Sequence, residues 1–232
     1  MTDKERLAIV EEKLGYKYNN IELLKLALTH KSYAFEKSIA SNNQYNERIE
    51  FLGDAILEHI ISDMLYNDKK IYSEGEMTKK RAAIVCETSL CIALKQTSIH
   101  EYIYLGKCEV QSKVEKKDAI IADAFEAILG SIYLDGGYEK AKEFVLTKLK
   151  KQIDEVLSGK DFNTDYKTKL QEVLQKDGNV KIEYKLIKEE GPEHDKTFSV
   201  QVFFNDKKIG DGIGKSKKSA EQAAAASAIK RI

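Results

Sequence analysis

The stretch Asn46-Glu-Arg-Ile-Glu-Phe-Leu-Gly-Asp-Ala-Ile-Leu-Glu-His-Ile-Ile61 poses the central question about this chain. Its large apolar residues recur at helical spacing and predict a helix over residues 46–66: Ile49, Leu52, Ile56 and Ile60. At about 100° per residue, Glu47 and Asp54 lie about 20° apart, with Glu50 on the same side. Carboxylates are rarely buried unless something pairs with them. This acidic side is therefore either solvated surface or a place where a cation binds.

A second segment, DAIIADAFEAILGSIYLD at residues 118–135, repeats the pattern. Asp123 and Glu126 lie three residues apart on one helical face among apolar neighbours, and Asp118 is expected to cap the helix. Gly53, in the middle of the first helix, predicts the close approach of another backbone. If the two helices meet, four carboxylates need a cation between them, and oxygen ligands favour Mg²⁺ or Mn²⁺. Periodicity alone leaves the solvated alternative open.

The composition sets broad limits. The 232 residues, with 42% hydrophobic content and a net charge of zero, predict one or two domains. No apolar run approaches the roughly 18 residues of a membrane span, and the charged N-terminus is not a secretory signal. Three cysteines without metal-site spacing predict free thiols in a cytoplasmic protein. Residues 163–232 hold 14 basic against 11 acidic side chains, which gives the C-terminal part the basic role.

The apolar patterns divide the chain into an all-α domain over residues 1–157, a linker at 158–164 and a small α+β domain at 165–232. The first domain has helical patterns at about 46–66, 76–96, 118–134 and 138–157. The second has the order helix, three strands, helix, with Asn205-Asp206 as the turn before the third strand.

Lysines gather where the last helix of the chain is expected to begin. Lys215, Lys217 and Lys218 stand near a helix N-terminus, which carries partial positive charge and normally favours acidic side chains. A bound phosphate would relieve this repulsion and use the free backbone N–H groups. Three solvated lysines are the alternative reading.

Several segments resemble the ribonuclease III family. The nine residues 46–54, Asn-Glu-Arg-Ile-Glu-Phe-Leu-Gly-Asp, resemble its signature motif, with Ile49 where leucine is usual. Ala-Asp-Ala-Phe-Glu-Ala at 122–127 is similar to its second acidic motif. Ala-Leu-Thr-His-Lys-Ser at 27–32 and Ser-Glu-Gly-Glu-Met-Thr at 73–78 match further family segments in the expected order. The resemblance covers nearly the whole chain.

This resemblance implies a Mg²⁺-dependent endonuclease, with Mn²⁺ as a substitute, that cleaves double-stranded RNA in ribosomal and messenger RNA processing. It implies no small-molecule cofactor. Two copies would pair, with Phe51 at the dimer interface, and would leave 5′-phosphates and short 3′ overhangs. The implied metal ligands are Glu50, Asp54, Asp123 and Glu126, of which Asp54 and Glu126 would be catalytic. The implied second-tier acids are Glu47 and Glu74.

The C-terminal part resembles the double-stranded RNA-binding domain, which mostly recognises the shape of A-form RNA. The resemblance implies that Lys215, Lys217 and Lys218 contact phosphates. It also implies that Gln171 and Glu172 enter one minor groove, and that His194 contacts a sugar in the next. Residues 165–168, Asp-Tyr-Lys-Thr, depart from the family's Asp-Pro-Lys-Thr. Since that proline only preorganises a helix start, RNA binding should survive its loss.

Two other functions are alternatives. The loss of any one of the four implied metal ligands would favour a non-catalytic relative that binds double-stranded RNA, and all four are present. A metal-dependent phosphohydrolase of small molecules is disfavoured by the C-terminal RNA module. His30 is expected to have a structural role rather than to act as a base.

Overall fold

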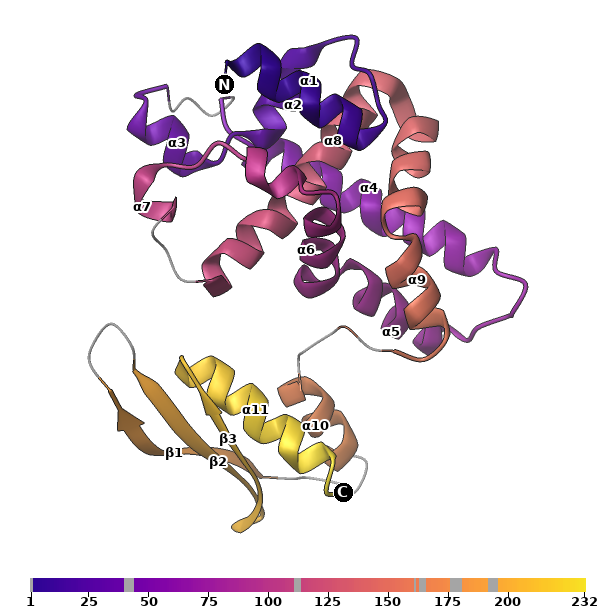
Figure 1. The fold of residues 1–232 in the computed structure, drawn as a ribbon. Coiled ribbons are helices and arrows are strands. Elements are labelled where there is room, and N and C mark those ends of the chain that lie inside the picture. The colour runs from indigo at the N-terminus through magenta and orange to yellow at the C-terminus, as the bar shows by residue number, and fades with distance from the viewer. Residues whose placement is uncertain are drawn as a thin grey trace. The chain divides into compact units, whose positions relative to one another are not determined.

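The chain folds into two compact units, Met1–Phe162 and Asn163–Ile232 (Figure 1). The computed structural model describes residues 2–39, 44–110, 114–160, 162, 166–175, 181–191 and 196–232, without the side chains of 114–116 and 175. The first unit is helical, and the second has two helices and a three-stranded sheet. The predicted fold class is therefore confirmed. Within the described ranges, no helix has both the length and the apolarity needed to cross a membrane.

The helices of the first unit begin and end at residues suited to those positions. Thr2 and Glu5 form a capping box at the start of α1, and Gly15, with a φ of +70°, ends that helix. Ser73 and Glu76 form the same box at the start of α5. The helices are α1 (Asp3–Leu14), α2 (Ile21–Leu28), α3 (Lys31–Glu36), α4 (Glu47–Tyr66), α5 (Glu74–Val85), α6 (Glu87–Gln96), the 3₁₀ turn η1 (Ile99–Tyr102), α7 (Lys107–Val110), α8 (Val114–Lys148) and α9 (Lys150–Leu157).

Two of the helix limits predicted from the sequence can be compared with the structure. The single helix predicted at 76–96 is wrong, because Cys86 has an extended backbone (φ −68°, ψ 153°) that separates α5 from α6. The break predicted between 134 and 138 is confirmed, because Gly137 has a φ of +79° and interrupts α8. That conformation favours glycine, which lacks a Cβ.

The start of α8 differs from the prediction. The helix begins at Val114, so Asp118 lies inside its first turns and does not cap it. Instead, the Asp118 carboxylate pairs with Lys95 Nζ of α6 at 2.6 Å. A side-chain partner on another helix thus takes the place of the backbone N–H groups that a capping aspartate would accept from.

Among the described elements of the first unit, α4 and α8 make the most extensive contact, and they cross near the middle of the domain (Figure 1). A Cβ added to Gly53 would overlap the carbonyl oxygen of Glu126. A Cβ added to Gly130 would overlap the carbonyl oxygen of Ile49. The two helices therefore touch backbone to backbone, which confirms the close approach predicted at Gly53.

Large apolar side chains surround this crossing. They come mainly from α4 and α8, with α2 and α6 packed against them, and form one continuous core. Its largest fully buried members include Leu24, Leu28, Leu57, Ile60, Leu90, Leu94, Phe125 and Ile128. Because so much apolar surface is removed from water, this core supplies the main stabilisation of the unit.

The second unit packs two helices on the same face of an antiparallel sheet, in the strand order β1-β2-β3 (Figure 1). Its elements are α10 (Tyr166–Gln175), β1 (Ile182–Glu190), β2 (Thr197–Phe204), β3 (Lys207–Gly214) and α11 (Lys217–Ile229). Asn205 and Asp206 have positive φ angles of 45° and 67° and form the predicted turn. Small and aliphatic side chains form its core: Leu170, Leu174, Val200, Val202, Ala220, Ala224, Ala225 and Ala228.

Alternate glycines let β3 lie directly against α11. A Cβ on Gly212 would overlap the backbone nitrogen of Ala224, and one on Gly210 would lie 2.5 Å from the Ala224 oxygen. At these two glycines, strand and helix meet through backbone and methyl groups. This contact explains why the glycine-rich strand and the alanine-rich helix occur together.

The crossing of α4 and α8 yields a testable prediction. Gly53→Ala should destabilise the first unit by roughly 1–3 kcal/mol, because overpacking forces the two backbones apart. Thermal unfolding of the full chain measures the effect as a lower Tm. Gly75→Ala in α5 is the matched control, since nothing lies within 4 Å of a Cβ there. An unchanged Tm for Gly53→Ala would contradict the close contact.

Candidate active site

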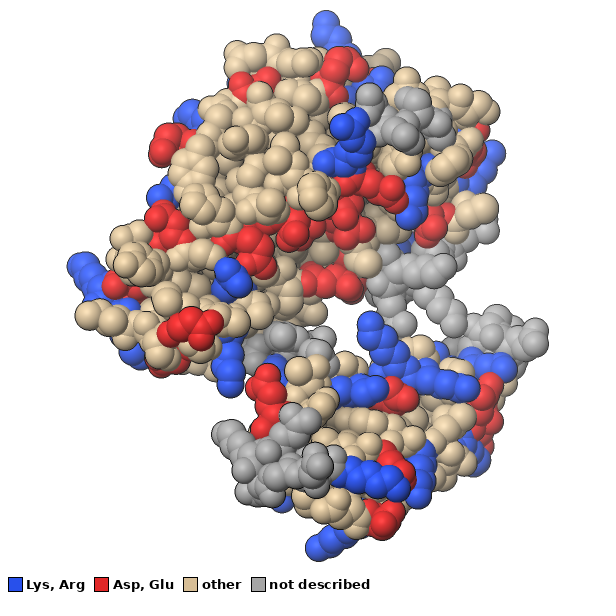
Figure 2. Space-filling model, turned by 180° about the vertical axis from the view of Figure 1, so that it is seen from behind, with Lys and Arg blue, Asp and Glu red and all other residues tan. Residues whose placement is uncertain are grey.

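The four predicted metal ligands come from the two helices that cross. Glu50 and Asp54 lie one turn apart on α4, and Asp123 and Glu126 lie on α8. The contact between Gly53 and the backbone of Glu126 brings these turns together. Glu50, Asp123 and Glu126 are partly buried, whereas Asp54 is exposed. We call these four residues the acidic cluster; Figure 2 shows acidic side chains gathered in a band on one face of the first unit.

The carboxylates of this cluster alter one another's proton affinity. Burial, followed by the negative charges of Asp54 and Glu50, raises the pKa of the Glu126 carboxyl from its ordinary 4.5 to about 8. Burial, then the charges of Asp123 and Glu47, raises the pKa of Glu50 to about 7. Burial also raises the pKa of Asp123. Since residues of α4 act on residues of α8 and the reverse, the acids share one region.

The donor atoms of the cluster suit a hard divalent cation. All of them are carboxylate oxygens, the ligands that Mg²⁺ and Mn²⁺ prefer. In the parts of the chain that the structure describes, no three acidic, imidazole or thiol groups already converge on one point. Like charges repel, so carboxylates at this spacing hold protons or stand apart unless a cation joins them. The residues present therefore fit a Mg²⁺ or Mn²⁺ ion.

The two second-tier acids lie in different surroundings. Glu47 is the first residue of α4, and its carboxylate pairs with Lys31 Nζ at 2.8 Å. Glu74 is the first residue of α5 and accepts a hydrogen bond from Thr78 Oγ1 at 3.2 Å. Glu47 raises the pKa of Glu50, but Glu74 is not among the main influences on the described cluster.

Sequence reasoning missed two acids that act on the cluster. Glu58 lies one turn beyond Asp54 on α4 and helps to raise the pKa of Glu126. Its carboxylate also pairs with Arg81 Nε of α5 at 2.6 Å. Glu87, at the start of α6, raises the pKa of Asp123. The i, i+4 spacing from Asp54 was a usable signal for Glu58, whereas no motif marks Glu87.

His30 has the surroundings of a structural residue. It is buried and caps α3, where its Nδ1 accepts a hydrogen bond from the Ser32 backbone at 3.3 Å and lies 2.8 Å from Ser32 Oγ. Burial lowers the pKa of its imidazole, which favours the neutral ring. Both observations agree with the structural role expected for it.

The predicted RNA contacts of the second unit lie on its two helices and just beyond β3. Gln171 and Glu172 are exposed on α10. Lys217 and Lys218 are the first two residues of α11, and Ser216 caps that helix by accepting from the Ser219 N–H. Lys215 is exposed before this cap. His194 lies outside the described residues.

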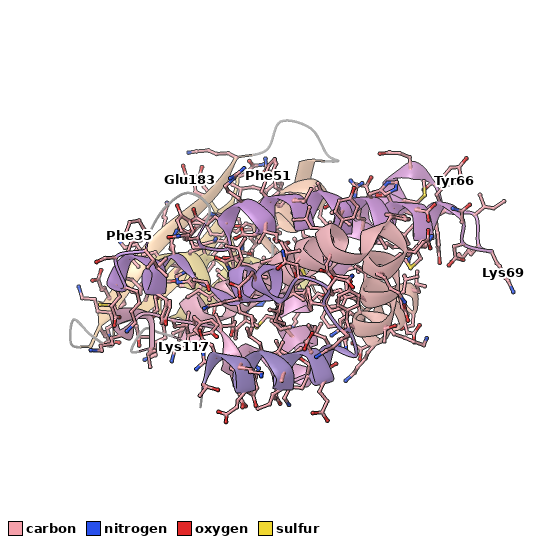
Figure 3. The ribbon with its side chains drawn as sticks, turned by 90° about the horizontal axis from the view of Figure 1, so that it is seen from above. Phe35, Phe51, Tyr66, Lys69, Lys117 and Glu183 are labelled. Carbon is pink, nitrogen blue, oxygen red and sulfur yellow. The ribbon has the colours of Figure 1, made fainter. Side chains whose placement is uncertain are left out.

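Phe51 is a large exposed apolar side chain on α4. Its relative exposure is 79%, and Figure 3 shows it at the surface of the first unit, far from Tyr66 at the other end of the helix. The same helix also contributes residues to a cavity of about 260 Å³. The cavity is lined by Leu26, Tyr45, Arg48, Ile49, Leu52 and Leu134.

Comparison with known protein families matches both units. Residues 20–153 match the family model described as Ribonuclease-III-like, and residues 166–232 match the Double-stranded RNA binding motif. The predicted resemblances are thereby confirmed, each on the unit that carries its motif.

Relatives of nearly the same length support the same assignment. The chain is 45% identical to Ribonuclease 3 of Clostridium tetani, over 96% of this chain and 93% of that protein. It is 44% identical to Ribonuclease 3 of Caldanaerobacter subterraneus, over 97% and 98%. The nuclease domain of ribonuclease III from Campylobacter jejuni superposes with a TM-score of 0.56 at 34% identity, over 65% of this chain and 98% of that one. The chain belongs to the ribonuclease III family of endoribonucleases.

Proposed function

We propose that this ribonuclease hydrolyses phosphodiester bonds in double-stranded RNA with Mg²⁺, as a homodimer that leaves 5′-phosphates and short 3′ overhangs. The observation that carries the proposal is the acidic cluster, in which two helices of a ribonuclease III unit share four carboxylates. The RNA binding motif in the same chain supports a duplex substrate. The cellular role would be the processing of ribosomal and messenger RNA in the cytoplasm.

In this proposal Glu50, Asp54, Asp123 and Glu126 hold the metal, and Mn²⁺ can replace Mg²⁺. A bound ion of this kind activates a water molecule and stabilises the leaving oxygen during phosphodiester hydrolysis. Asp54 and Glu126 would be the catalytic residues, since Asp54 is exposed to solvent, where RNA could reach it, and Glu126 is partly buried beside it. Glu47 and Glu74 would assist metal and substrate binding. No small-molecule cofactor is required.

The second unit would bind the duplex. Lys215, Lys217 and Lys218 stand at the N-terminal end of α11, whose dipole and free N–H groups attract phosphate. Gln171 and Glu172, exposed on α10, would reach into a minor groove, and His194 into the next. Recognition of this kind depends on A-form shape rather than on sequence.

The homodimer would form through Phe51. An exposed phenylalanine is unfavourable in water, and its neighbour on the same helix, Leu52, lines a cavity of about 260 Å³. In a two-fold dimer each Phe51 can fill the cavity of the other copy, because both features recur on the two facing surfaces. A solved nuclease domain of Campylobacter jejuni ribonuclease III is described as having a region involved in dimer formation, which supports a dimer for this chain.

The first prediction concerns cleavage. Asp54→Asn and Glu126→Gln should each reduce cutting of a long RNA duplex at least about a hundredfold, because each removes a charge from the metal site. RNA binding should remain close to that of the wild type. A denaturing gel with Mg²⁺ or EDTA measures the cutting, and Glu143→Gln, an exposed acid that pairs with Lys140, is the control. Tight binding without cutting by the wild type would favour the non-catalytic alternative.

The second prediction concerns pH. The pKa of Glu126 is about 8 in the folded state against an ordinary 4.5, so the folded state binds the extra proton between these values. In EDTA this contribution to stability is present at low pH and is lost as the pH rises from about 4.5 through 8. Glu126→Gln should therefore be more stable than the wild type at pH 9 and similar at pH 4.

Thermal unfolding across this pH range measures the difference. Saturating Mg²⁺ should reduce it at pH 9, because the ion neutralises the carboxylates of the wild type. A difference in Tm that does not change with pH would contradict the assigned proton affinity of Glu126.

The third prediction concerns assembly. Phe51→Asp should raise the dimer dissociation constant about thirtyfold or more, since a buried aromatic anchor contributes about 2 kcal/mol or more. Sedimentation velocity on the full chain measures the shift toward monomer. Ile71→Asp is the control, because Ile71 is 96% exposed but lies beyond the end of α4. A wild type that is monomeric at high concentration would overturn the dimer itself.

A further inference from the structure

The segment at residues 27–32 carries a lysine at the edge of the acidic cluster. Lys31 Nζ lies 2.8 Å from Glu47 Oε1. Glu47 begins α4, one turn before Glu50. The lysine therefore lies beside the helix that supplies two of the four acids of the cluster. It was not among the residues of the predicted metal site.

The backbone that carries Lys31 is fixed on both sides. The Asn46 N–H donates to the Thr29 oxygen at 2.9 Å, which ties the segment to the start of α4. The His30 N–H donates to the Tyr104 oxygen at 3.1 Å. Ser32 Oγ accepts from the Gly106 N–H at 2.9 Å. The base of the lysine is therefore held in place, while its side chain remains 54% exposed.

Lys31 is a positive charge that acts on two acids of the cluster. Its ammonium group opposes the rise in the pKa of Glu50 and of Asp123. Among the described residues, every other charge with a main influence on the partly buried acids of the cluster belongs to a carboxylate. An RNA strand that reaches these acids would therefore meet Lys31 as a positive charge among carboxylates.

We infer that Lys31 is a substrate-positioning residue, which leaves Glu47 and binds a phosphate of the RNA strand beside the bond to be cleaved. The inference rests on the proposed function, because it takes the acidic cluster as the cleavage site. The exchange is feasible since a half-exposed ion pair contributes little to stability, and a flexible lysine can follow a phosphate as a mobile point charge. It also leaves Glu47 unpaired, which increases the attraction of the site for cations.

The experiment compares Lys31→Gln, Lys31→Arg and the control Lys25→Gln in the full chain. Lys25 is also a partly exposed lysine of the first unit in an ion pair, with Asp3 at 2.9 Å. RNA binding is measured against salt in the Glu126→Gln background with Mg²⁺, so that the duplex stays intact. Loss of one phosphate contact in each protomer should make the slope of log K against log salt less negative by about 0.9 per protomer, or about 1.8 per dimer, for Lys31→Gln.

The second readout is RNA cleavage, measured for the Lys31 variants with Glu126 unchanged. Lys31→Gln should lower kcat/KM by about tenfold to a hundredfold, because the strand is held less firmly over the site. Lys31→Arg should retain most of the wild-type salt slope and kcat/KM, since it keeps the positive charge.

A third readout needs no RNA. Removing a positive charge beside the carboxylates should tighten Mg²⁺ binding to the free Lys31→Gln protein, measured by calorimetry. If Lys31 had only a structural role, Lys31→Gln would instead lower the Tm, and Glu47→Gln would lower the Tm by a similar amount. Wild-type slope and kcat/KM in Lys31→Gln would overturn the inference. If the wild type did not cleave RNA, the proposed function would fail, while the slopes would still decide whether Lys31 contacts phosphate.

Discussion

The contact between the backbones of α4 and α8 at Gly53 and Gly130 is the constraint on which the nuclease unit depends. Any side chain at either position would push the helices apart, because a Cβ would overlap a carbonyl oxygen of the facing helix. The same contact sets Glu126 beside the turn that carries Asp54. Packing and chemistry are therefore coupled at one point: the helices can approach only without side chains, and the acids meet only if the helices approach.

This arrangement works against the stability of the free protein. Partly buried carboxylates from two helices raise one another's pKa, which means that their charged forms are disfavoured in the folded state. The apolar core around Leu57, Ile60 and Phe125 holds the helices together despite this repulsion. Functional sites often carry local strain that the surrounding structure stabilises, and the acidic cluster follows that rule.

The fold class, the order of helices and strands in the second unit and the close approach at Gly53 could be predicted from the sequence. Each follows from a local pattern or from a residue with one physical meaning. The turn at Asn205-Asp206 and the break near Gly137 belong to the same kind. The break at Cys86 escaped prediction, because an ordinary residue adopts an extended backbone there. Glu87 and Lys31 also escaped, since their place beside the cluster arises from helix packing and no spacing along the chain encodes it.

The alternate glycines of β3 have a consequence for the RNA-binding unit. Two strand residues advance about 6.7 Å and four helical residues about 6 Å, so each glycine from 210 to 214 meets nearly one step of α11. The alanine face of α11 can therefore pack on the strand only in registers that place its backbone over these glycines. A shift of α11 by four residues against β3 would move Lys217 and Lys218 by about 6 Å along the sheet. The glycines of β3 therefore fix the position of α11 on the sheet, and with it the spacing between α10 and α11.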